Sequence, residues 1–124
     1  MEIIFLIGRI LFVALFVSSG YGHLTKVKQM GGYAKSMGVP AAEFMTIVTG
    51  IMIVVGGIMV LFNFEMFYGA LLIFLFLIPT SFMMHAFWKV KDAGMKQVQQ
   101  IMFMKNLSLA GAALMIMYFT YGSH

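Results

Sequence analysis

The sequence contains no cysteine, and this single absence removes several functions. Without a thiol the chain cannot form a disulfide, offer a thiolate to a metal, carry a persulfide or exchange thiol with disulfide. Walker and dinucleotide-binding fingerprints are missing as well, and no Ser, His and acid stand in a recognisable nucleophile setting. Sulfur or thiol redox chemistry involving this chain therefore needs a partner.

Charge is scarce too, because only 10% of the 124 residues are Asp, Glu, Lys or Arg. Apolar residues make up 62%, and the mean hydropathy is +0.98, which is too apolar for one small water-soluble core. The net charge of +4 does not indicate nucleic-acid binding, because the lysines gather in two short connecting segments rather than along a stripe. We expect the lipid bilayer to cover most of the surface and no nucleic-acid partner.

Four apolar runs are long enough to cross a hydrocarbon core of roughly 30 Å. Pro40 stands where the second run begins, and 63–65 leaves room only for a tight hairpin before the third. Apolar residues spaced among lysines in 24–39 predict a short interfacial helix, broken at Gly31-Gly32. The expected fold is all-α, an antiparallel four-helix bundle integral to the membrane. It forms a single domain, 1–124, with spans at about 3–23, 41–62, 64–88 and 101–121.

Lysines are distributed unequally between the two faces of this arrangement. The loops 24–39 and 89–100 share one face, whereas the Asn63 hairpin and both termini share the other, which has no lysine. The lysines of the first face are Lys26, Lys28, Lys35, Lys89, Lys91 and Lys96. The positive-inside rule then predicts a multi-pass protein of the inner (plasma) membrane, with the Lys-rich loops cytoplasmic and the termini outside.

Counting inward from the Lys-rich loops places several polar side chains of different helices at similar depth. They are His23, Glu43, His85, Trp88, Lys105 and Asn106. A charge in hydrocarbon costs about 2.5–3.5 kcal/mol on insertion scales, so Lys105 should face protein, water or an acidic partner. Snorkelling to the headgroups is the simpler alternative, and Glu43 is the nearest acid by depth.

His85, Trp88 and Asp92 are spaced i, i+3, i+7 and share one face if the third helix continues past the membrane. We therefore count Asp92, with His23 and Glu43, among the partners available at this face. Simpler interpretations exist, because Trp88 can be an interfacial anchor and His85 can be a structural histidine. Haem ligation by His23 and His85 is a further alternative, which their place at the membrane edge disfavours.

Arg9 differs from these residues in depth. It lies about 10 Å in from the lysine-free face by helical rise, within reach of Glu65 or Glu2. An unpaired charge at this depth is costly, so we predict a structural ion pair between Arg9 and Glu65. Snorkelling of Arg9 to the headgroups is the alternative.

A set of short motifs runs in order over nearly the whole chain. The set comprises Gly8-Arg9, Phe16, Gly20, Gly38-Val39-Pro40, Pro79-Thr80, His85-Ala86-Phe87-Trp88, Asp92, Gln99, Phe103-Met104-Lys105-Asn106 and Gly111. With these motifs the chain resembles the DoxX-like family of small four-helix membrane proteins. One departure is His23, which stands where the family usually has Lys.

The resemblance implies a family linked with quinone-dependent redox systems, including a membrane subunit of thiosulfate:quinone oxidoreductase. A membrane subunit is then expected rather than a stand-alone catalyst, with other membrane or redox subunits, or copies of itself, as partners. We expect His85, Trp88, Lys105 and Asn106 to bind a quinone headgroup, with no covalent cofactor and no metal. The alternative is a structural or assembly scaffold whose polar cluster only locks helices together. A transporter is less favoured, because only Pro79 interrupts a span.

Overall fold

The computed structural model describes residues 1–121, and the last three residues of the predicted domain, 1–124, lie outside the described part. Within residues 1–121 the chain is helical and contains no strand. The elements are α1 (Glu2–Thr25), α2 (Val27–Ser36), α3 (Ala42–Leu61), α4 (Met66–Met84), the 3₁₀ helix η1 (Phe87–Lys89) and α5 (Ala93–Thr120). The predicted all-α fold is confirmed.

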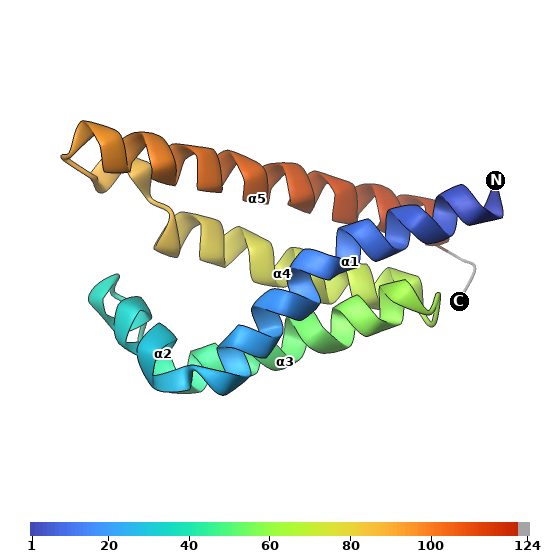
Figure 1. Ribbon diagram of the computed structural model, residues 1–124, viewed down its shortest axis with the longest axis horizontal. Helices are drawn as coiled ribbons and strands as arrows, with labels where there is room; N and C mark the ends of the chain where they lie inside the picture. Colours follow the sequence, from blue (N-terminus) through green and yellow to red (C-terminus); the bar gives the residue numbers. More distant parts are fainter. Residues whose placement is uncertain (122–124) are drawn as a thin grey trace.

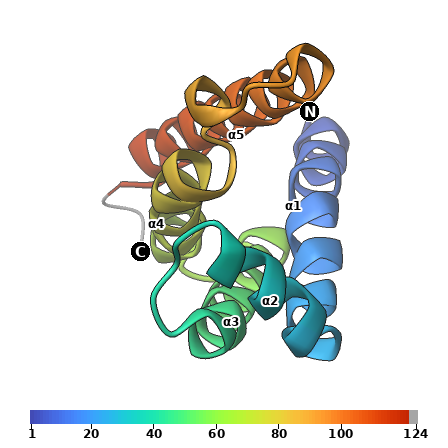
Figure 2. The same ribbon diagram turned by 90° about the vertical axis from the view of Figure 1, so that its left-hand side faces the viewer.

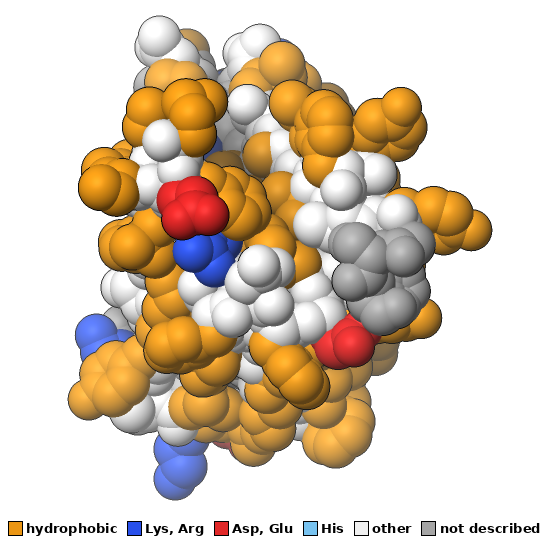
Figure 3. All heavy atoms as spheres, turned by 90° about the vertical axis from the view of Figure 1, so that its right-hand side faces the viewer, with side chains coloured by type: hydrophobic (Ala, Val, Ile, Leu, Met, Phe, Trp, Pro, Cys, Tyr) orange, Lys and Arg blue, Asp and Glu red, His pale blue; other side chains and the backbone are white. Residues whose placement is uncertain are grey.

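Four helical segments are long and apolar enough to cross a membrane: α1, α3, α5, and α4 together with η1. Large apolar side chains such as Ile3, Leu11 and Ile51 remain exposed on them. Figure 3, which faces the end where α1 begins, shows apolar side chains over most of that surface. Helices that expose this much apolar surface need lipid or protein around them. The chain is a multi-pass membrane protein in contact with the bilayer.

The four long helices form an open, curved layer in the order α1, α3, α4, α5 (Figure 1). Neighbours in this order pack together and run antiparallel, whereas α1 and α5 make no extensive contact over the described residues. Figure 2 shows the resulting gap between α1 and α5. The predicted antiparallel bundle is confirmed, and it is open along one side.

The two ends of the molecule differ in charge. The start of α1, the α3–α4 turn and the end of α5 lie at one end, which we call the Lys-free end. Helix α2 and the connection from α4 to α5 lie at the other, the Lys-rich end. This end has Lys26, Lys28, Lys35, Lys89, Lys91 and Lys96.

Glycines allow α3 to approach α1 and α4 closely. A Cβ on Gly56 would lie 2.8 Å from the backbone oxygen of Gly69, and a Cβ on Gly20 would lie 3.1 Å from that of Gly50. Small residues at such contacts favour association of helices in lipid, where packing rather than the hydrophobic effect drives it. Buried apolar side chains fill the core beside them, among them Phe16, Ile53, Ile73 and Leu77.

Helix α5 begins earlier than predicted. The segment 89–100 contains charged and amide residues and was expected as a loop, but α5 is already helical from Ala93. Asp92 caps the helix, because its carboxylate accepts a hydrogen bond from the backbone N–H of Met95 at 2.9 Å. The polar residues thus mark a part of the helix outside the apolar span 101–121, not a break in it.

Helix α4 ends earlier than predicted. The expected span 64–88 stops as an α-helix at Met84, and the chain then turns through η1. His85, Trp88 and Asp92 therefore do not share one helical face, because they lie on a turn, a 3₁₀ helix and a cap. This turn is needed to reverse the chain into the antiparallel α5.

Helix α2 is confirmed as a short helix between α1 and α3, but the predicted break at Gly31-Gly32 is wrong. The helix is continuous from Val27 to Ser36. Gly31 is buried, and a Cβ on it would lie 2.8 Å from Cγ of Glu43. The missing side chain at Gly31 therefore serves close packing against α3 rather than a turn.

Candidate functional site

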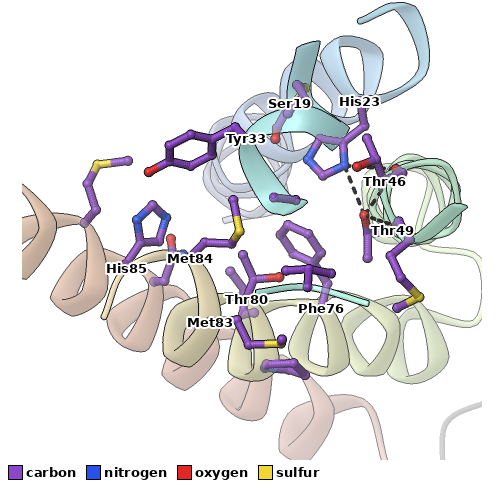
Figure 4. Close-up of a pocket in the computed structure, with 18 of the residues that line it drawn as sticks. Ser19, His23, Tyr33, Thr46, Thr49, Phe76, Thr80, Met83, Met84 and His85 are labelled. Atoms are coloured by element: carbon purple, nitrogen blue, oxygen red, sulfur yellow. Dashed lines mark hydrogen bonds between the residues drawn. The ribbon is translucent and has the colours of Figure 1, made fainter. Parts of the chain in front are cut away.

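A cavity of about 350 Å³ lies in the Lys-rich half of the molecule, and all five α-helices contribute to its lining. This volume falls in the usual range of small-molecule sites, about 300–1,000 Å³. We call it the polar cavity, because it brings together four residues singled out in the sequence. They are His23 of α1, His85 after α4, and Lys105 and Asn106 of α5. Figure 4 shows the two histidine rings on different sides of the cavity.

The ring of His23 is oriented by α3. Its Nδ1 lies 3.2 Å from the backbone oxygen of Thr46 and 3.1 Å from the hydroxyl oxygen of Thr49. The Thr49 hydroxyl in turn donates to the backbone oxygen of Met45 at 2.7 Å. Because the Thr46 carbonyl oxygen can only accept, Nδ1 of His23 carries the proton. Its Nε2 makes no hydrogen bond within residues 1–121 and is free to accept one from the cavity.

The ring of His85 is oriented in the same manner by α5. Its Nδ1 lies 2.8 Å from Oε1 of Gln99, a side-chain oxygen that can only accept. Nδ1 therefore donates, and Nε2 is left as an acceptor without a partner among the described residues. Gln99 reaches His85 because α5 extends outward to Ala93, beyond the apolar span.

Asn106 is the most unusual residue of the cavity. Its side chain is only 7% exposed, yet its amide makes no hydrogen bond with any residue of 1–121. Neither of its polar atoms is sealed off in the protein, and Asn106 is one of the residues that line the cavity. Most polar side chains this little exposed have a hydrogen-bond partner, so the amide of Asn106 is available to a ligand or to water.

Lys105 adds a positive charge beside this amide. Its Nζ has one weak contact, 3.9 Å from Sδ of Met102, and no carboxylate pairs with it in the described part of the chain. The ammonium group and the amide of Asn106 therefore both keep hydrogen-bond donors for a ligand or for water. These two side chains and the two imidazoles, which together offer donors and acceptors, thus line one cavity.

Three predicted residues lie elsewhere. Trp88 does not line the cavity; it is 47% exposed and packs edge-to-face on Phe103 with ring centroids 5.4 Å apart. Trp88 is therefore not part of the predicted headgroup site. Helix α4 ends at Met84, so Trp88 does not lie on the helical face that it was expected to share with His85. Glu43 is exposed beside Gly31, and Asp92 is the cap of α5. Neither pairs with Lys105.

Sequence reasoning missed the hydroxyl-bearing residues of the cavity. These are Ser19, Tyr33, Thr46, Thr49 and Thr80. Part of the signal was present, because Ser19 and His23 are one helical turn apart, as are Thr46 and Thr49. The sequence did not indicate which side of α3 faces α1. No three His, Asp or Glu side chains of residues 1–121 are grouped so that they could hold a metal ion.

Arg9 lies at the Lys-free end, away from the polar cavity, and its contacts differ from the prediction. Its Nη1 donates to the backbone oxygen of Leu61 at 3.0 Å, and its guanidinium carbon lies 4.6 Å from the ring centroid of Phe5. No ion pair with Glu65 forms in the described structure. Leu61 ends α3, where carbonyl groups lack helical partners and the helix dipole is negative. The Leu61 carbonyl oxygen, in the last turn of α3, is thus the partner of Arg9 in place of the expected Glu65 carboxylate.

This arrangement predicts little energetic coupling between Arg9 and Glu65. In a double-mutant cycle of Arg9→Ala and Glu65→Ala, the losses of unfolding free energy in detergent micelles should add to within about 0.5 kcal/mol. Arg9→Ala alone should destabilise the protein, because it removes the partner of the Leu61 carbonyl. Coupling above about 1 kcal/mol would show instead that the ion pair forms.

Comparison with known proteins agrees with this architecture. The model of the DoxX family matches residues 4–86, which includes His23 and His85. Over 111 residues the chain is 32% identical to "Inner membrane protein YqjF" of Escherichia coli (strain K12), covering 90% of this chain and 79% of that protein. No solved structure matches the chain. By the family match and by this relative, the chain belongs to the DoxX family.

Proposed function

We propose that this protein is a quinone-binding membrane subunit of a redox complex and that the polar cavity holds the quinone headgroup. The observation that carries the proposal is the amide of Asn106, a residue that is only 7% exposed, lines the cavity and makes no hydrogen bond with residues 1–121. A ligand with hydrogen-bonding groups would satisfy it. The unpaired Lys105 beside it favours a ligand with electron-rich oxygens.

Both redox forms of a quinone find partners in this cavity. The carbonyl oxygens of a quinone accept hydrogen bonds, which Lys105 and the Asn106 amide can donate. The hydroxyl groups of a quinol donate, and Nε2 of His23 and of His85 can accept from them. Reduction of a quinone to its quinol adds two electrons and two protons, so a site with both donors and acceptors suits the pair of redox forms better than a site with either alone.

The walls of the cavity suit an aromatic ring. Phe76 and the methionines Met30, Met45, Met83, Met84 and Met102 line it together with the polar groups. Thioether side chains are flexible and make favourable contacts with aromatic rings. An apolar slot with a few convergent polar groups is the usual form of a small-molecule site.

Purification in mild detergent tests the proposal directly. We expect solvent extraction of the purified protein to release quinone, and native mass spectrometry to show a partner that contains flavin, haem or an iron–sulfur cluster. A redox partner is required because this chain has no cysteine and, within residues 1–121, no metal-holding group. Recovery of protein partners without quinone would favour the alternative, an assembly scaffold whose polar groups only hold helices in place.

The orientation in the membrane follows from the lysine asymmetry and is part of the proposal. We propose that the Lys-rich end is cytoplasmic, which would place the polar cavity near the cytoplasmic surface. Single cysteines at Phe64, in the α3–α4 turn, and at Ser36, at the end of α2, can report this on a cysteine-free background. An impermeant maleimide should label Phe64→Cys in intact cells and Ser36→Cys only in opened membranes. The reverse pattern would refute the orientation.

A further inference from the structure

A second cavity, of about 590 Å³, lies at the Lys-free end, and we call it the apolar cavity. Helices α1 and α5 supply its lining residues except for Met66 of α4. Most of these side chains are apolar, such as Phe5, Met115 and Phe119. Within residues 1–121 the two cavities share no lining residue, so the occupant of one does not decide the occupant of the other.

Arg9 is the one charged residue that lines the apolar cavity in residues 1–121, and no carboxylate balances its charge there. Its Nη1 donates to the Leu61 carbonyl oxygen, and the Phe5 ring lies against the guanidinium. Neither Glu2 nor Glu65, the two acidic side chains of the Lys-free end, forms an ion pair with it. A charge on a membrane-spanning helix is costly without a partner, and a carbonyl and a ring leave this charge uncompensated.

Two nitrogens of Arg9 without a hydrogen-bond partner share one edge of the guanidinium. Nε is buried and has no partner in residues 1–121. Nη2 has none either, but it is not sealed off in the protein as Nε is. These two nitrogens lie on the same edge of the planar group, because Nη1 is on the side of the Cδ atom. A carboxylate whose two oxygens accept from Nε and Nη2 together is the preferred partner of this edge.

The depth of Arg9 and the apolar lining decide which carboxylate fits. Arg9 is about two helical turns from the start of α1 at Glu2, about 10 Å along the helix axis. A carboxylic acid reaches this depth in its neutral form and ionises beside the guanidinium, whereas a phosphodiester is charged near neutral pH and is costly to bury. The apolar side chains of the cavity suit a hydrocarbon tail. An acid at the end of a single long chain has both features.

We propose that the apolar cavity binds a long-chain fatty acid of the bilayer, with its carboxylate on the Nε–Nη2 edge of Arg9. The hydrocarbon chain lies against the apolar side chains of α1 and α5. Because Nε is buried, the guanidinium or the side chains over it shift slightly when the carboxylate binds. This site is separate from the polar cavity and does not depend on the proposed binding of quinone.

The probes are palmitic acid with a photoreactive group at the end of its chain and the matching alcohol, which has the same chain and no charge. In phosphatidylcholine nanodiscs, the acid should label peptides of α1 near Phe5 and of α5 near Met115 and Phe119. Unmodified palmitic acid should compete with this labelling. The alcohol should label the same peptides about tenfold less, because it makes no charge-assisted hydrogen bonds with Arg9.

Two variants separate the charge from the space. Arg9→Gln removes the charge and keeps an amide that can donate to Leu61, so labelling by the acid should fall about tenfold, to the level of the alcohol. Ala112→Phe fills the cavity from α5 and should reduce labelling by both probes. The matched controls are Lys91→Gln at the Lys-rich end and Gly111→Phe, where a Cβ meets nothing within 4 Å. Neither residue lines a cavity, so both controls should label like the unchanged protein.

The proposal fails if the acid and the alcohol label the unchanged protein equally, and this comparison requires no variant to fold. Competition by phosphatidylglycerol and not by palmitic acid would identify a phospholipid headgroup as the occupant and overturn the fatty acid. Crosslinking of the cavity peptides to a second copy of the chain, without label from either probe, would show a protein interface in place of a lipid site.

Discussion

Asn106→Leu should abolish quinone retention while leaving the fold intact. The substitution removes an amide donor and acceptor at nearly constant volume from a side chain that is 7% exposed. Since the amide makes no hydrogen bond with residues 1–121, its loss breaks no internal hydrogen bond. Quinone extracted per chain and unfolding in detergent micelles measure the two effects.

The change in unfolding free energy separates a ligand site, where it stays small, from a structural lock. If Asn106 held helices together, Asn106→Leu would lower the unfolding free energy. Gln100→Leu is the matched control, because Gln100 lies on the same helix, is exposed and lines neither cavity. We expect the control to retain quinone. Unchanged quinone content in Asn106→Leu would contradict the assignment of the polar cavity.

Gly56→Ala should produce the largest loss of stability among single-methyl changes in the spans. The added Cβ would lie 2.8 Å from the backbone oxygen of Gly69 and 3.2 Å from side-chain atoms of Leu72 and Ile73, so α3 and α4 must move apart. Overpacking of this kind costs about 1–3 kcal/mol, which outweighs the gain in helix propensity of about 1 kcal/mol for replacing glycine by alanine.

The control for this experiment is Gly111→Ala, where a Cβ meets nothing within 4 Å. It should raise the unfolding free energy by up to about 1 kcal/mol through helix propensity alone. Denaturation of the two variants in mixed micelles should then show changes in unfolding free energy of opposite sign. A gain for Gly56→Ala would show that α3 and α4 are not in backbone contact.

Composition and hydropathy were sufficient to predict the spans, because lipid imposes length and apolarity on every crossing helix. They could not locate the ends of α4 and α5. In 89–100 the polar residues lie on a helix that extends beyond the membrane, and polarity alone does not distinguish such a helix from a loop. For α4 the error was the opposite one: the residues after Met84 were expected to continue the helix, and this placed Trp88 on the face of His85.

The open side of the layer was also beyond sequence reasoning. Helices that are apolar all round give no indication of which neighbour each one packs against. Depth counting nonetheless placed His23, His85, Lys105 and Asn106 together, because residues near one membrane face have few positions to occupy. The hydrogen-bond partners that orient the rings are Gln99 for His85 and Thr46 for His23. Which residues face each other depends on how each helix is rotated about its axis, and only the structure shows this rotation.

A quinone with a photoreactive group on its ring tests the central claim most directly, since it reports where the headgroup lies. After illumination in nanodiscs and digestion, we expect the label on peptides of α1 near His23 and of α5 near Lys105 and Asn106, and competition by unmodified quinone. Label spread over the exposed apolar faces of the helices, without competition, would contradict a headgroup site in the polar cavity.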